Sequence, residues 1–380
     1  MGRVGVMKVS VNGKAGRWAW TAVPLLAAAC SATERPGATA NAPQPRPPVI
    51  VSIPVPITQP RLAKPAPSGL AAEVQRLQRA FVGKAGIAVR AVDDGWTVEA
   101  GGRQKLPQQS VSKLWVAMTL LDLRDQGKAR LDDPITVRRE DLTLFHQPIA
   151  WLVKDAGYQT TVGDLLTRAL TQSDNTANDR LLSFVGGPDA VRAMIAAKQL
   201  GGIRFGPGER ALQAQTAGLT WDQSWGGTNG FEIARSRLPL DLRTAALDRY
   251  VGDPPDGAEP LAIADALARL ARGELLSETS TRVLLDTMGM STTGRARLRA
   301  ALPGGWTLAH KTGTGQDLRG RNAGFNDVGL ITAPDGRRFA IAVMIGDTRR
   351  PIRERQQLIQ DVARAVTMYA GSGATGMVAN

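Results

Sequence analysis

Residues 108–118 read QQSVSKLWVAM, in which Ser110 and Lys113 stand three positions apart just before an apolar run. Side chains three apart on a helix project from the same face, so the serine and the lysine would lie side by side at the start of a buried helix. A serine hydroxyl is a weak nucleophile near neutral pH unless an adjacent base activates it, and a neutral lysine amine is such a base. About one Ser-x-x-Lys tetrapeptide is expected by chance in a chain of this length, so its meaning depends on the rest of the sequence.

Two further motifs follow this stretch in the order of the chain. Residues 171–180, TQSDNTANDR, contain Ser173-Asp174-Asn175, and residues 309–315, AHKTGTG, contain Lys311-Thr312-Gly313. Alone, the first is also typical of a helix N-cap and the second of a strand that ends in a turn. Together and in this order, Ser-x-x-Lys, Ser-Asp-Asn and Lys-Thr-Gly are the motif set of class A β-lactamases and penicillin-binding proteins.

Across residues 70–370 the sequence resembles the class A serine β-lactamase family. The stretch KLPQQSVSKLWVA is similar to the start of the family's nucleophile helix, and TTGRARLRAALPGGWTLAHKTGTG is similar to its path into the Lys-Thr-Gly strand. Glu209 follows Ser173 at the family's spacing for the glutamate of deacylation. The resemblance implies an α+β fold, in which an antiparallel β-sheet flanked by helices is joined to a mostly helical subdomain and the site lies between them.

The residue pattern itself predicts strands at both ends of this region and helices between them. Apolar residues at helical spacing predict a helix at 70–81, and strands follow at 86–92 and 96–100 around an Asp-Asp-Gly turn. Near the C-terminus, WTLAHKTG predicts a strand, NDVGLITAPDGRRFAIAVMI a hairpin, and the apolar spacing after it a helix near 353–369. Residues 107–290 read mainly as helices and loops, so the two ends of the region are expected to meet in one sheet.

The resemblance implies a role for each motif residue. As catalytic residues it implies the nucleophile Ser110, its base Lys113, the proton relay Ser173, the cation Lys311 and the deacylation base Glu209. As substrate-binding residues it implies Asn175, Gln213, Arg297, Thr312, Gly313 and Thr314. Backbone N–H groups of Ser110 and Thr314 would form the oxyanion hole.

Two of the implied positions have alternatives. Arg297 aligns with an arginine that some family members use to bind the substrate carboxylate, and Arg319 and Arg321 are the alternatives. Either Phe145 or His146 would stand at the rim of the cleft, where the family often has an aromatic residue.

The sequence departs from the family pattern around Glu209. Gln213 stands where asparagine is usual, although it keeps an amide that can hold water. Pro207-Gly208 stand where Arg-Trp is common, so the ion pair that often braces this loop is not predicted. The departures bear on deacylation, because an acyl-enzyme persists unless a carboxylate activates water at its carbonyl.

A second departure is an insertion at residues 214–258, which contains Trp221, Trp225 and Phe231. The insertion is either a flap over the site or a simple cover of the domain. As a flap, it would narrow the range of accepted substrates.

The composition excludes several kinds of site. The chain has 380 residues with only two His and one Cys, too few for a usual zinc cluster or an internal disulfide bond. His310, at a strand end, is expected to be packed or solvated rather than part of a Ser-His-Asp triad. The net charge is +13, but no basic run with interleaved aromatic residues indicates nucleic acid as a partner. The implied chemistry needs no metal or cofactor, and the expected ligand is a small β-lactam.

Residues 1–68 are expected to lie outside the folded domain. Basic residues precede an apolar stretch that ends in LLAAAC, which is typical of an export signal. Cys30 at its end resembles the lipidated cysteine of bacterial lipoproteins, and a soluble secreted form is the alternative. Proline after Cys30 predicts an extended linker. The expected organisation is a signal segment at 1–30, a linker at 31–68, a hydrolase domain at 69–372 and a flexible tail at 373–380.

The sequence therefore predicts a monomeric serine β-lactamase of class A type, exported to the periplasm or cell envelope and lipid-anchored if Cys30 is modified. One alternative is a D,D-peptidase, or another penicillin-binding or esterase-like serine hydrolase, that forms the acyl-enzyme but releases it slowly. The other alternative is a non-catalytic, peptidoglycan-binding lipoprotein. Glu209 weighs against the first alternative, and the complete motif set weighs against the second.

Overall fold

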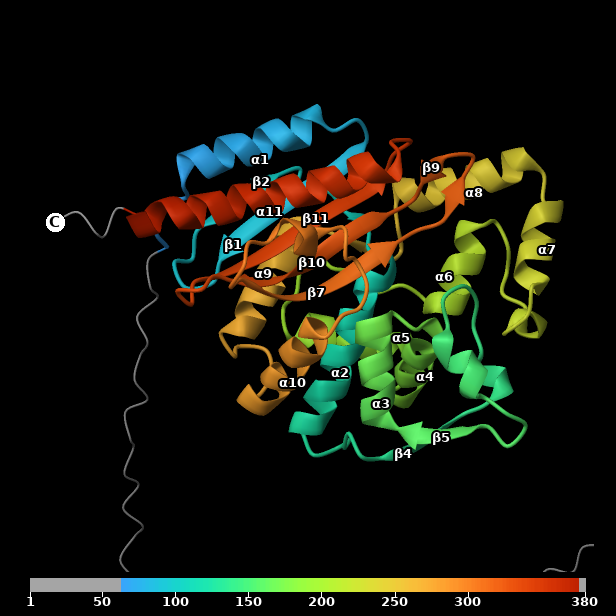
Figure 1. Cartoon of the computed structure of the whole chain (residues 1–380). Helices are drawn as coiled ribbons and strands as arrows, with labels where there is room; N and C mark the ends of the chain where they lie inside the picture. Colours follow the sequence, from blue (N-terminus) through green and yellow to red (C-terminus); the bar gives the residue numbers. More distant parts are fainter. Residues whose placement is uncertain (1–62, 376–380) are drawn as a thin grey trace, which may run out of the picture. The chain divides into compact units, whose positions relative to one another are not determined.

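A five-stranded antiparallel sheet lies at the centre of residues 63–375, the part of the chain that this computed structural model describes (Figure 1). In spatial order its strands are β2 (Thr97–Ala100), β1 (Lys84–Ala91), β11 (Arg338–Asp347), β10 (Phe325–Thr332) and β7 (Thr307–Thr314). Strand β1 pairs with β11 along its whole length, so the two ends of the domain are neighbours in the sheet. The predicted meeting of the two ends and the predicted α+β fold class are confirmed.

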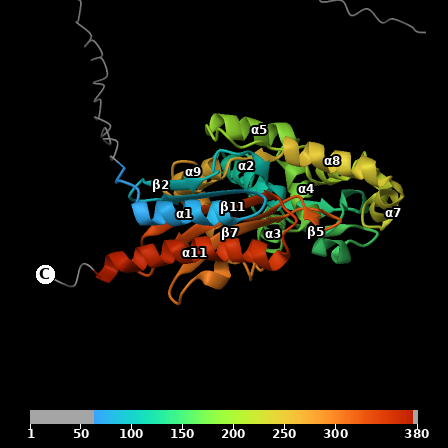
Figure 2. The ribbon, with the colours of Figure 1, turned by 90° about the horizontal axis from the view of Figure 1, so that it is seen from above.

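Helices cover both faces of the sheet. One face carries α1 (Ser68–Ala80) and α11 (Ile352–Thr375), which lie side by side in Figure 2, and the other carries α9 (Pro260–Ala271). Side chains alternate along a strand, and β11 uses this alternation to fit its two layers. Its large residues at positions 339, 341, 343 and 345 join the cluster beneath α1 and α11, whereas Ala340 and Ala342 face the cluster that contains α9.

A helical subdomain packs beneath the α9 side of the sheet. Its helices are α2 (Lys113–Asp125), α3 (Val162–Thr167), α4 (Asn175–Phe184), α5 (Gly187–Ala197) and α10 (Glu278–Gly289). Every residue of α2 from Lys113 to Leu121 is buried, as expected for a helix surrounded by others. The α-helix begins at Lys113, and Ser110 lies in the preceding 3-10 turn η1 (Gln109–Ser112).

The insertion at 214–258 folds into helices at one edge of the subdomain. After α6 (Glu209–Thr216) it forms α7 (Gly230–Arg237) and α8 (Leu240–Gly252) (Figure 1). Phe231 of α7 is fully buried in a small cluster that also holds Leu144 and Ala214, with Trp221 and Trp225 packed against it. The insertion is therefore anchored to the domain by its own apolar core.

Shorter elements complete the described part of the chain. The remaining strands are β3 (Leu106–Pro107) with β6 (Gly257–Ala258), β4 (Pro134–Val137) with β5 (Tyr158–Thr161), and β8 (Asp317–Leu318) with β9 (Arg321–Asn322). The remaining helical turns are η2 (Arg139–Asp141), η3 (Pro148–Leu152), η4 (Arg168–Gln172), η5 (Gln223–Trp225) and η6 (Leu298–Ala301). Among residues 63–375, none of the helices has the length and apolarity needed to cross a bilayer. The predicted signal segment with Cys30, and residues 31–62 of the predicted linker, lie outside the described residues, as do residues 376–380. The predicted linker ended at 68 and the predicted tail began at 373, whereas α1 begins at Ser68 and α11 extends to Thr375.

Candidate active site

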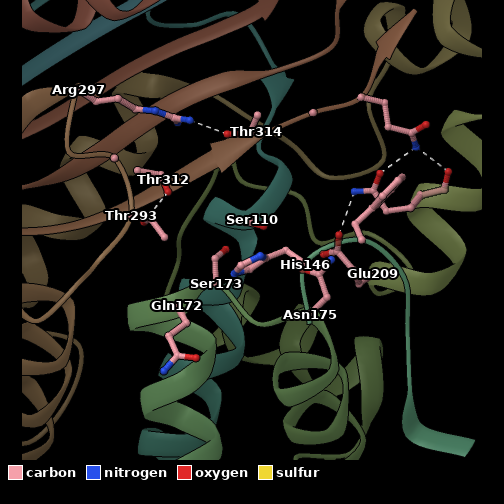
Figure 3. A pocket seen from close by; sticks show the side chains of 15 residues that line it. Ser110, His146, Gln172, Ser173, Asn175, Glu209, Thr293, Arg297, Thr312 and Thr314 are labelled. Carbon is pink, nitrogen blue, oxygen red and sulfur yellow. Dashed lines mark hydrogen bonds between the residues drawn. The ribbon is translucent and has the colours of Figure 1, made fainter. Parts of the chain in front are cut away.

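A cavity of about 330 Å³ opens between the sheet and the helical subdomain (Figure 3). The turn before α2 contributes Ser110, and strand β7 contributes Thr312 and Thr314. Ser173, just before α4, and Asn175, its first residue, also line the cavity. The lining of the cavity also includes Phe145, His146, Glu209, Gln213, Arg297 and Gln316. Motifs that are far apart in the sequence thus converge on one cavity.

Lys113 connects three of the predicted site residues. Its Nζ lies 2.9 Å from Ser110 Oγ, 2.9 Å from Asn175 Oδ1 and 3.1 Å from Glu209 Oε2. The lysine side chain is fully buried and that of Glu209 is 6% exposed, so the two form a buried ion pair. The amine of Lys113 thus lies between the carboxylate of Glu209 and the hydroxyl of Ser110 and contacts both.

Lys311 occupies the opposite side of the cavity. Its Nζ donates to Ser173 Oγ at 2.9 Å and to the carbonyl of Thr312 at 2.9 Å. Burial lowers the pKa of Lys311 well below its usual value, and the nearby charges of Lys113 and Arg297 lower it further. A buried amine with a lowered pKa gives up a proton more readily, and the Ser173 hydroxyl is the group within its reach.

The motif Ser173-Asp174-Asn175 serves both structure and site. Asp174 is the N-cap of α4, where its side chain accepts a hydrogen bond from the backbone of Ala177. Ser173, with φ 60°, and Asn175 flank this cap and line the cavity. Asp174 of this motif therefore caps the helix, whereas Ser173 and Asn175 belong to the cavity.

Backbone strain is concentrated around the cavity. Gln109, Phe145 and Ser173 adopt left-handed conformations, with φ of 53°, 61° and 60°, which are unfavourable for residues with a Cβ atom. Asn175 fixes one of these turns, because its Nδ2 donates to the carbonyl of Leu144, next to Phe145. Such strain is typical of functional sites, where surrounding contacts hold it in place.

Glycine is needed where β7 passes the nucleophile turn. A Cβ atom on Gly313 would lie 2.3 Å from the carbonyl oxygen of Gln108. Contacts between real Cβ atoms and oxygen are never this short, so any side chain at Gly313 would push the strand and the turn apart. The structure thus gives Gly313 a steric role in bringing Thr312 and Thr314 close to Ser110.

Arg297 provides a buried cation at the far end of the cavity. Its guanidinium donates to the carbonyls of Gly313 and Asn326 and to Thr314 Oγ1, and it stacks 3.7 Å from the ring centre of Phe325. Burial lowers its pKa to about 10. It therefore stays charged near neutral pH; the nearby charge of Asp327 favours the cation, although no carboxylate of residues 63–375 forms an ion pair with it.

The alternatives to Arg297 have other partners or positions. The guanidinium of Arg321 is paired with the carboxylates of Asp347 and Asp248, which raise its pKa. Arg319 has a left-handed backbone, and its carbonyl accepts a hydrogen bond from Arg349. Of the three candidates, Arg297 is the one that lines the cavity.

A half-buried aspartate contacts the backbone at Glu209, where the sequence lacks the usual ion pair. Asp179 of α4 accepts hydrogen bonds from the backbone N–H groups of Glu209, at 3.0 Å, and Arg210, at 3.3 Å. Burial raises the pKa of its carboxyl group, and the neighbouring charge of Glu209 raises it further. Gly208 precedes them with φ 98°, a conformation that favours glycine. Sequence reasoning missed Asp179, although its position one helical turn after Asn175 points it to the same side of α4.

Gln213 links the glutamate to the nucleophile turn. Its Nε2 donates to Glu209 Oε1 at 2.9 Å and to Gln109 Oε1 at 3.0 Å. The amide orientation is set by these two acceptors, because a carboxylate accepts and never donates when ionised. The residue that replaces the family's asparagine therefore contacts Glu209 directly.

The two histidines occupy different environments. His310 is fully buried, and its Nδ1 lies 2.7 Å from Asp327 Oδ1. Of the two predicted environments, packed or solvated, it therefore has the packed one. His146 lines the cavity together with Phe145, and both rim candidates are thus present. Among residues 63–375, no group of three or more His, Cys, Asp or Glu side chains is arranged to hold a metal ion.

A second buried network, unforeseen in the sequence, supports the turn before Ser110. Asp256 Oδ2 accepts from the backbone N–H of Gln109 at 2.8 Å and lies 3.2 Å from the hydroxyl of Tyr250. Gln109 Nε2 in turn donates to the Tyr250 hydroxyl at 2.6 Å. Because Tyr250 belongs to α8, the insertion contributes to the conformation of the nucleophile turn.

This network predicts a pH-dependent stability. Burial raises the pKa of Asp256 from its ordinary 3.8 to about 6, so the folded state keeps a proton that the unfolded chain has already released. The free energy of unfolding is therefore expected to fall by up to about 3 kcal/mol as the pH rises from about 4 to about 6. Urea denaturation across this range would measure the slope.

The matched comparison for this prediction is Asp256→Asn against Asp253→Asn. Asn at 256 has no proton to release, so this part of the slope should disappear, whereas Asp253 is 79% exposed and its replacement should leave the slope intact. Equal slopes in the wild type and Asp256→Asn would contradict the assignment.

Comparison with known proteins adds an independent line of observation. Residues 69–370 match the model of the "Beta-lactamase enzyme family". The extended-spectrum beta-lactamase PER-1 of Pseudomonas aeruginosa is 31% identical over 304 residues, which cover 78% of this chain and 86% of that protein. Beta-lactamase CTX-M-25 of Escherichia coli is 28% identical over 295 residues, which cover 77% and 86%. The crystal structure of a beta-lactamase from Chitinophaga pinensis has a TM-score of 0.65 at 27% identity, with 79% of this chain and 99% of that chain covered.

Proposed function

Because this chain belongs to the beta-lactamase enzyme family and is a serine β-lactamase of class A type, we propose that it opens the lactam amide through an acyl-enzyme on Ser110. The fold, the family match and the named relatives support the enzyme class.

Acylation begins at the contact between Ser110 and Lys113. Transfer of a proton from Lys113 to Glu209, across 3.1 Å, leaves a neutral amine 2.9 Å from the serine hydroxyl. The amine takes the hydroxyl proton as Oγ bonds to the lactam carbonyl carbon, and backbone N–H groups of Ser110 and Thr314 receive the developing oxyanion. Ser173, held by Lys311, then passes its proton to the ring nitrogen as the C–N bond breaks and is reprotonated by Lys113. Glu209 finally returns its proton to Lys113, so the step ends with Glu209 as a carboxylate and the serine proton on the ring nitrogen.

Substrate orientation uses the two ends of the cavity. The carboxylate of a β-lactam is anionic, and the buried charge of Arg297 behind the hydroxyls of Thr312 and Thr314 offers it a cationic pocket. Asn175 lines the opposite wall and keeps its carbonyl towards Lys113 and its Nδ2 towards Leu144. We assign to it the hydrogen bond with the side-chain amide of the substrate, because it is an amide side chain in the lining of the cavity.

Deacylation needs a water molecule activated beside the ester. Glu209 accepts the proton of that water as its oxygen attacks the ester carbon, and the proton returns to Ser110 Oγ when the ester bond breaks. Gln213 fixes one oxygen of this carboxylate and Lys113 the other. The observation that carries the proposal is the position of Glu209, which contacts the same lysine as the nucleophile Ser110. A carboxylate at this position favours hydrolysis of the acyl-enzyme over its accumulation.

Glu209→Gln is expected to acylate and then stall. Removal of the anion that pairs with Lys113 favours the neutral amine, so the variant needs no proton transfer to residue 209 before acylation. Its deacylation rate should fall by about 10²- to 10⁴-fold, the usual contribution of a general base. An intact-mass time course with excess penicillin would show a transient adduct on the wild type and a stoichiometric, lasting adduct on the variant. Glu278→Gln, at a side chain that is 87% exposed, is the matched control and should clear its adduct normally.

Each contrary outcome of this experiment has a distinct meaning. A lasting adduct on the wild type would favour the slowly deacylating D,D-peptidase or penicillin-binding alternative. No adduct with any β-lactam would favour the non-catalytic lipoprotein. Rapid clearance by Glu209→Gln would refute the role of Glu209 while leaving the nucleophile in place.

Export and lipidation are a separate part of the proposal. The apolar stretch before Cys30 supports export to the cell envelope, and the small residues before Cys30 support lipidation of its thiol. Membrane partitioning of the full chain, compared with Cys30→Ser, tests the anchor, and equal partitioning would favour the soluble secreted form. That the enzyme is a monomer stays a prediction.

A further inference from the structure

We propose that Arg235, on the inserted helix α7, is a positioning residue for deacylation that acts on Glu209 through Gln316 and Gln213. Arg235 lies outside the lining of the cavity, whereas Gln316 and Gln213 line it. The inference rests on the proposed role of Glu209 as the deacylation base. It extends that role by giving the insertion a part in the reaction.

A directed chain of hydrogen bonds connects the two charged ends. Arg235 donates to Gln316 Oε1 at 3.0 Å, and Gln316 Nε2 donates to Gln213 Oε1 at 2.9 Å and to the Gln213 carbonyl at 2.8 Å. Gln213 Nε2 then donates to Glu209 Oε1 at 2.9 Å, a link drawn at Glu209 in Figure 3. Each amide accepts on the side of the cation and donates on the side of the anion.

The first member of this chain reinforces its direction. A guanidinium can only donate, so Arg235 requires the carbonyl end of Gln316 and favours the orientation in which its NH₂ group faces Gln213. The backbone carbonyl of Gln213 favours the same orientation, and the acceptors Glu209 and Gln109 fix the amide of Gln213. Without Arg235, Gln316 Oε1 has no donor among residues 63–375, and the series is weakened because hydrogen bonds in such a series strengthen one another.

Aromatic contacts hold Arg235 where it can perform this task. Its guanidinium carbon lies 5.4 Å from the ring centre of the buried Phe231 and 6.0 Å from that of Phe145. The two rings meet edge to face at 5.3 Å. Within the described part of the chain no carboxylate forms an ion pair with Arg235, so Gln316 receives its hydrogen bond without a competing anion.

The variants follow from the polarity of the chain. Arg235→Met keeps an unbranched side chain against the aromatic rings but removes the donors. Gln316→Glu keeps, and by its charge strengthens, the contact with Arg235, yet it presents oxygen to the oxygens of Gln213 and cannot donate. Arg235→Lys retains a donor, and Arg237→Met, at an exposed position of the same helix, is the matched control.

The experiment separates acylation from deacylation in the full chain by rapid-quench intact mass with a penicillin. Arg235→Met and Gln316→Glu should each deacylate about tenfold more slowly, with acylation within about twofold of the wild type, so kcat and KM fall together. Arg235→Lys should recover most of the deacylation rate, and Arg237→Met should match the wild type. Because Gln316→Glu also loses two donated hydrogen bonds, its unfolding temperature is measured alongside the kinetics. The selective loss of deacylation, together with its recovery in Arg235→Lys, is the result that a merely structural role would not give.

Two results would overturn the inference. Wild-type deacylation in both Arg235→Met and Gln316→Glu would show that the chain does not reach Glu209. An equal loss of acylation and deacylation would show a general disturbance of the cavity. Glu209→Gln is measured alongside to distinguish failure of this inference from failure of the proposed function. Rapid deacylation by Glu209→Gln would refute the role of Glu209 as the base, whereas slow deacylation by it would leave that role intact.

Discussion

Ser110→Ala is expected to lower kcat/KM for a penicillin by about 10⁵-fold or more, the size of loss seen when the nucleophile of a serine hydrolase is removed. Among residues 63–375, its Oγ is the hydroxyl that Lys113 Nζ contacts directly, at 2.9 Å. Without it no acyl-enzyme can form, and the remaining groups can only bind the substrate. Initial-rate hydrolysis and intact mass on the same preparations would measure the loss.

The matched control for this prediction lies in the same turn. Ser112 donates its hydroxyl to the carbonyl of Gln109 rather than to Lys113, so Ser112→Ala should keep kcat/KM within about threefold of the wild type. An adduct that still forms on Ser110→Ala would show that another residue is the nucleophile. Similar losses in both variants would show that the turn, rather than the hydroxyl, limits the reaction.

Lys113→Met is expected to reduce both activity and stability. Loss of the base should lower kcat/KM by about 10³- to 10⁴-fold. Because the carboxylate of Glu209 would stay buried without its cation, the free energy of unfolding should also fall by about 3 kcal/mol or more. Steady-state kinetics and urea denaturation on the same variant would measure the two effects separately.

A double variant separates these two effects. Lys113→Met with Glu209→Gln removes both charges of the pair, so most of the lost stability should return. Its hydrolysis should stay as low as that of the single variant, because neither base is restored. A Lys113→Met protein as stable as the wild type would contradict the ion pair, and a double variant with recovered activity would contradict the role of the lysine.

The parts of the fold that the sequence predicted are those coded by neighbouring residues. Strand β11 alternates large and small apolar residues, and the Pro-Asp-Gly turn before it marks the hairpin, so both could be read locally. Strand β1 was predicted at 86–92 and lies at Lys84–Ala91, a difference of the usual size at element ends. The pairing of β1 with β11 followed from the placement of strands at both ends of the domain.

Among the residues of the cavity, those that belong to the three motifs could be predicted from the sequence. Ser110, Ser173 and Thr312 carry recognisable neighbours, and the structure brings them together. Gln109 contacts Tyr250 across 141 positions and Gln213 contacts Gln316 across 103, and single polar residues in loops carry no local sign of such partners. These contacts are decided by tertiary packing, which a one-dimensional pattern does not encode.

The insertion at 214–258 shows the same limit. Its tryptophans and Phe231 suggested packing against the domain, and Phe231 is buried. Whether the insertion narrows the range of accepted substrates stays a prediction. Its contacts with Gln109 through Tyr250, and with Gln316 through Arg235, favour support of the reacting groups as a second role.

The pairing of β1 with β11 also sets the order in which the molecule can fold. Lys84 is the partner of Asp347, so the central sheet cannot close until nearly the whole domain has left the ribosome. Contacts between such distant segments make folding slow, because a long loop must close before the strands stabilise each other. Strand β7 reaches the nucleophile turn only as part of this sheet, which makes assembly of the cavity one of the last events in folding. A chain whose C-terminal strands have not yet been synthesised is therefore expected to lack both the closed sheet and the assembled cavity, and thus to be inactive.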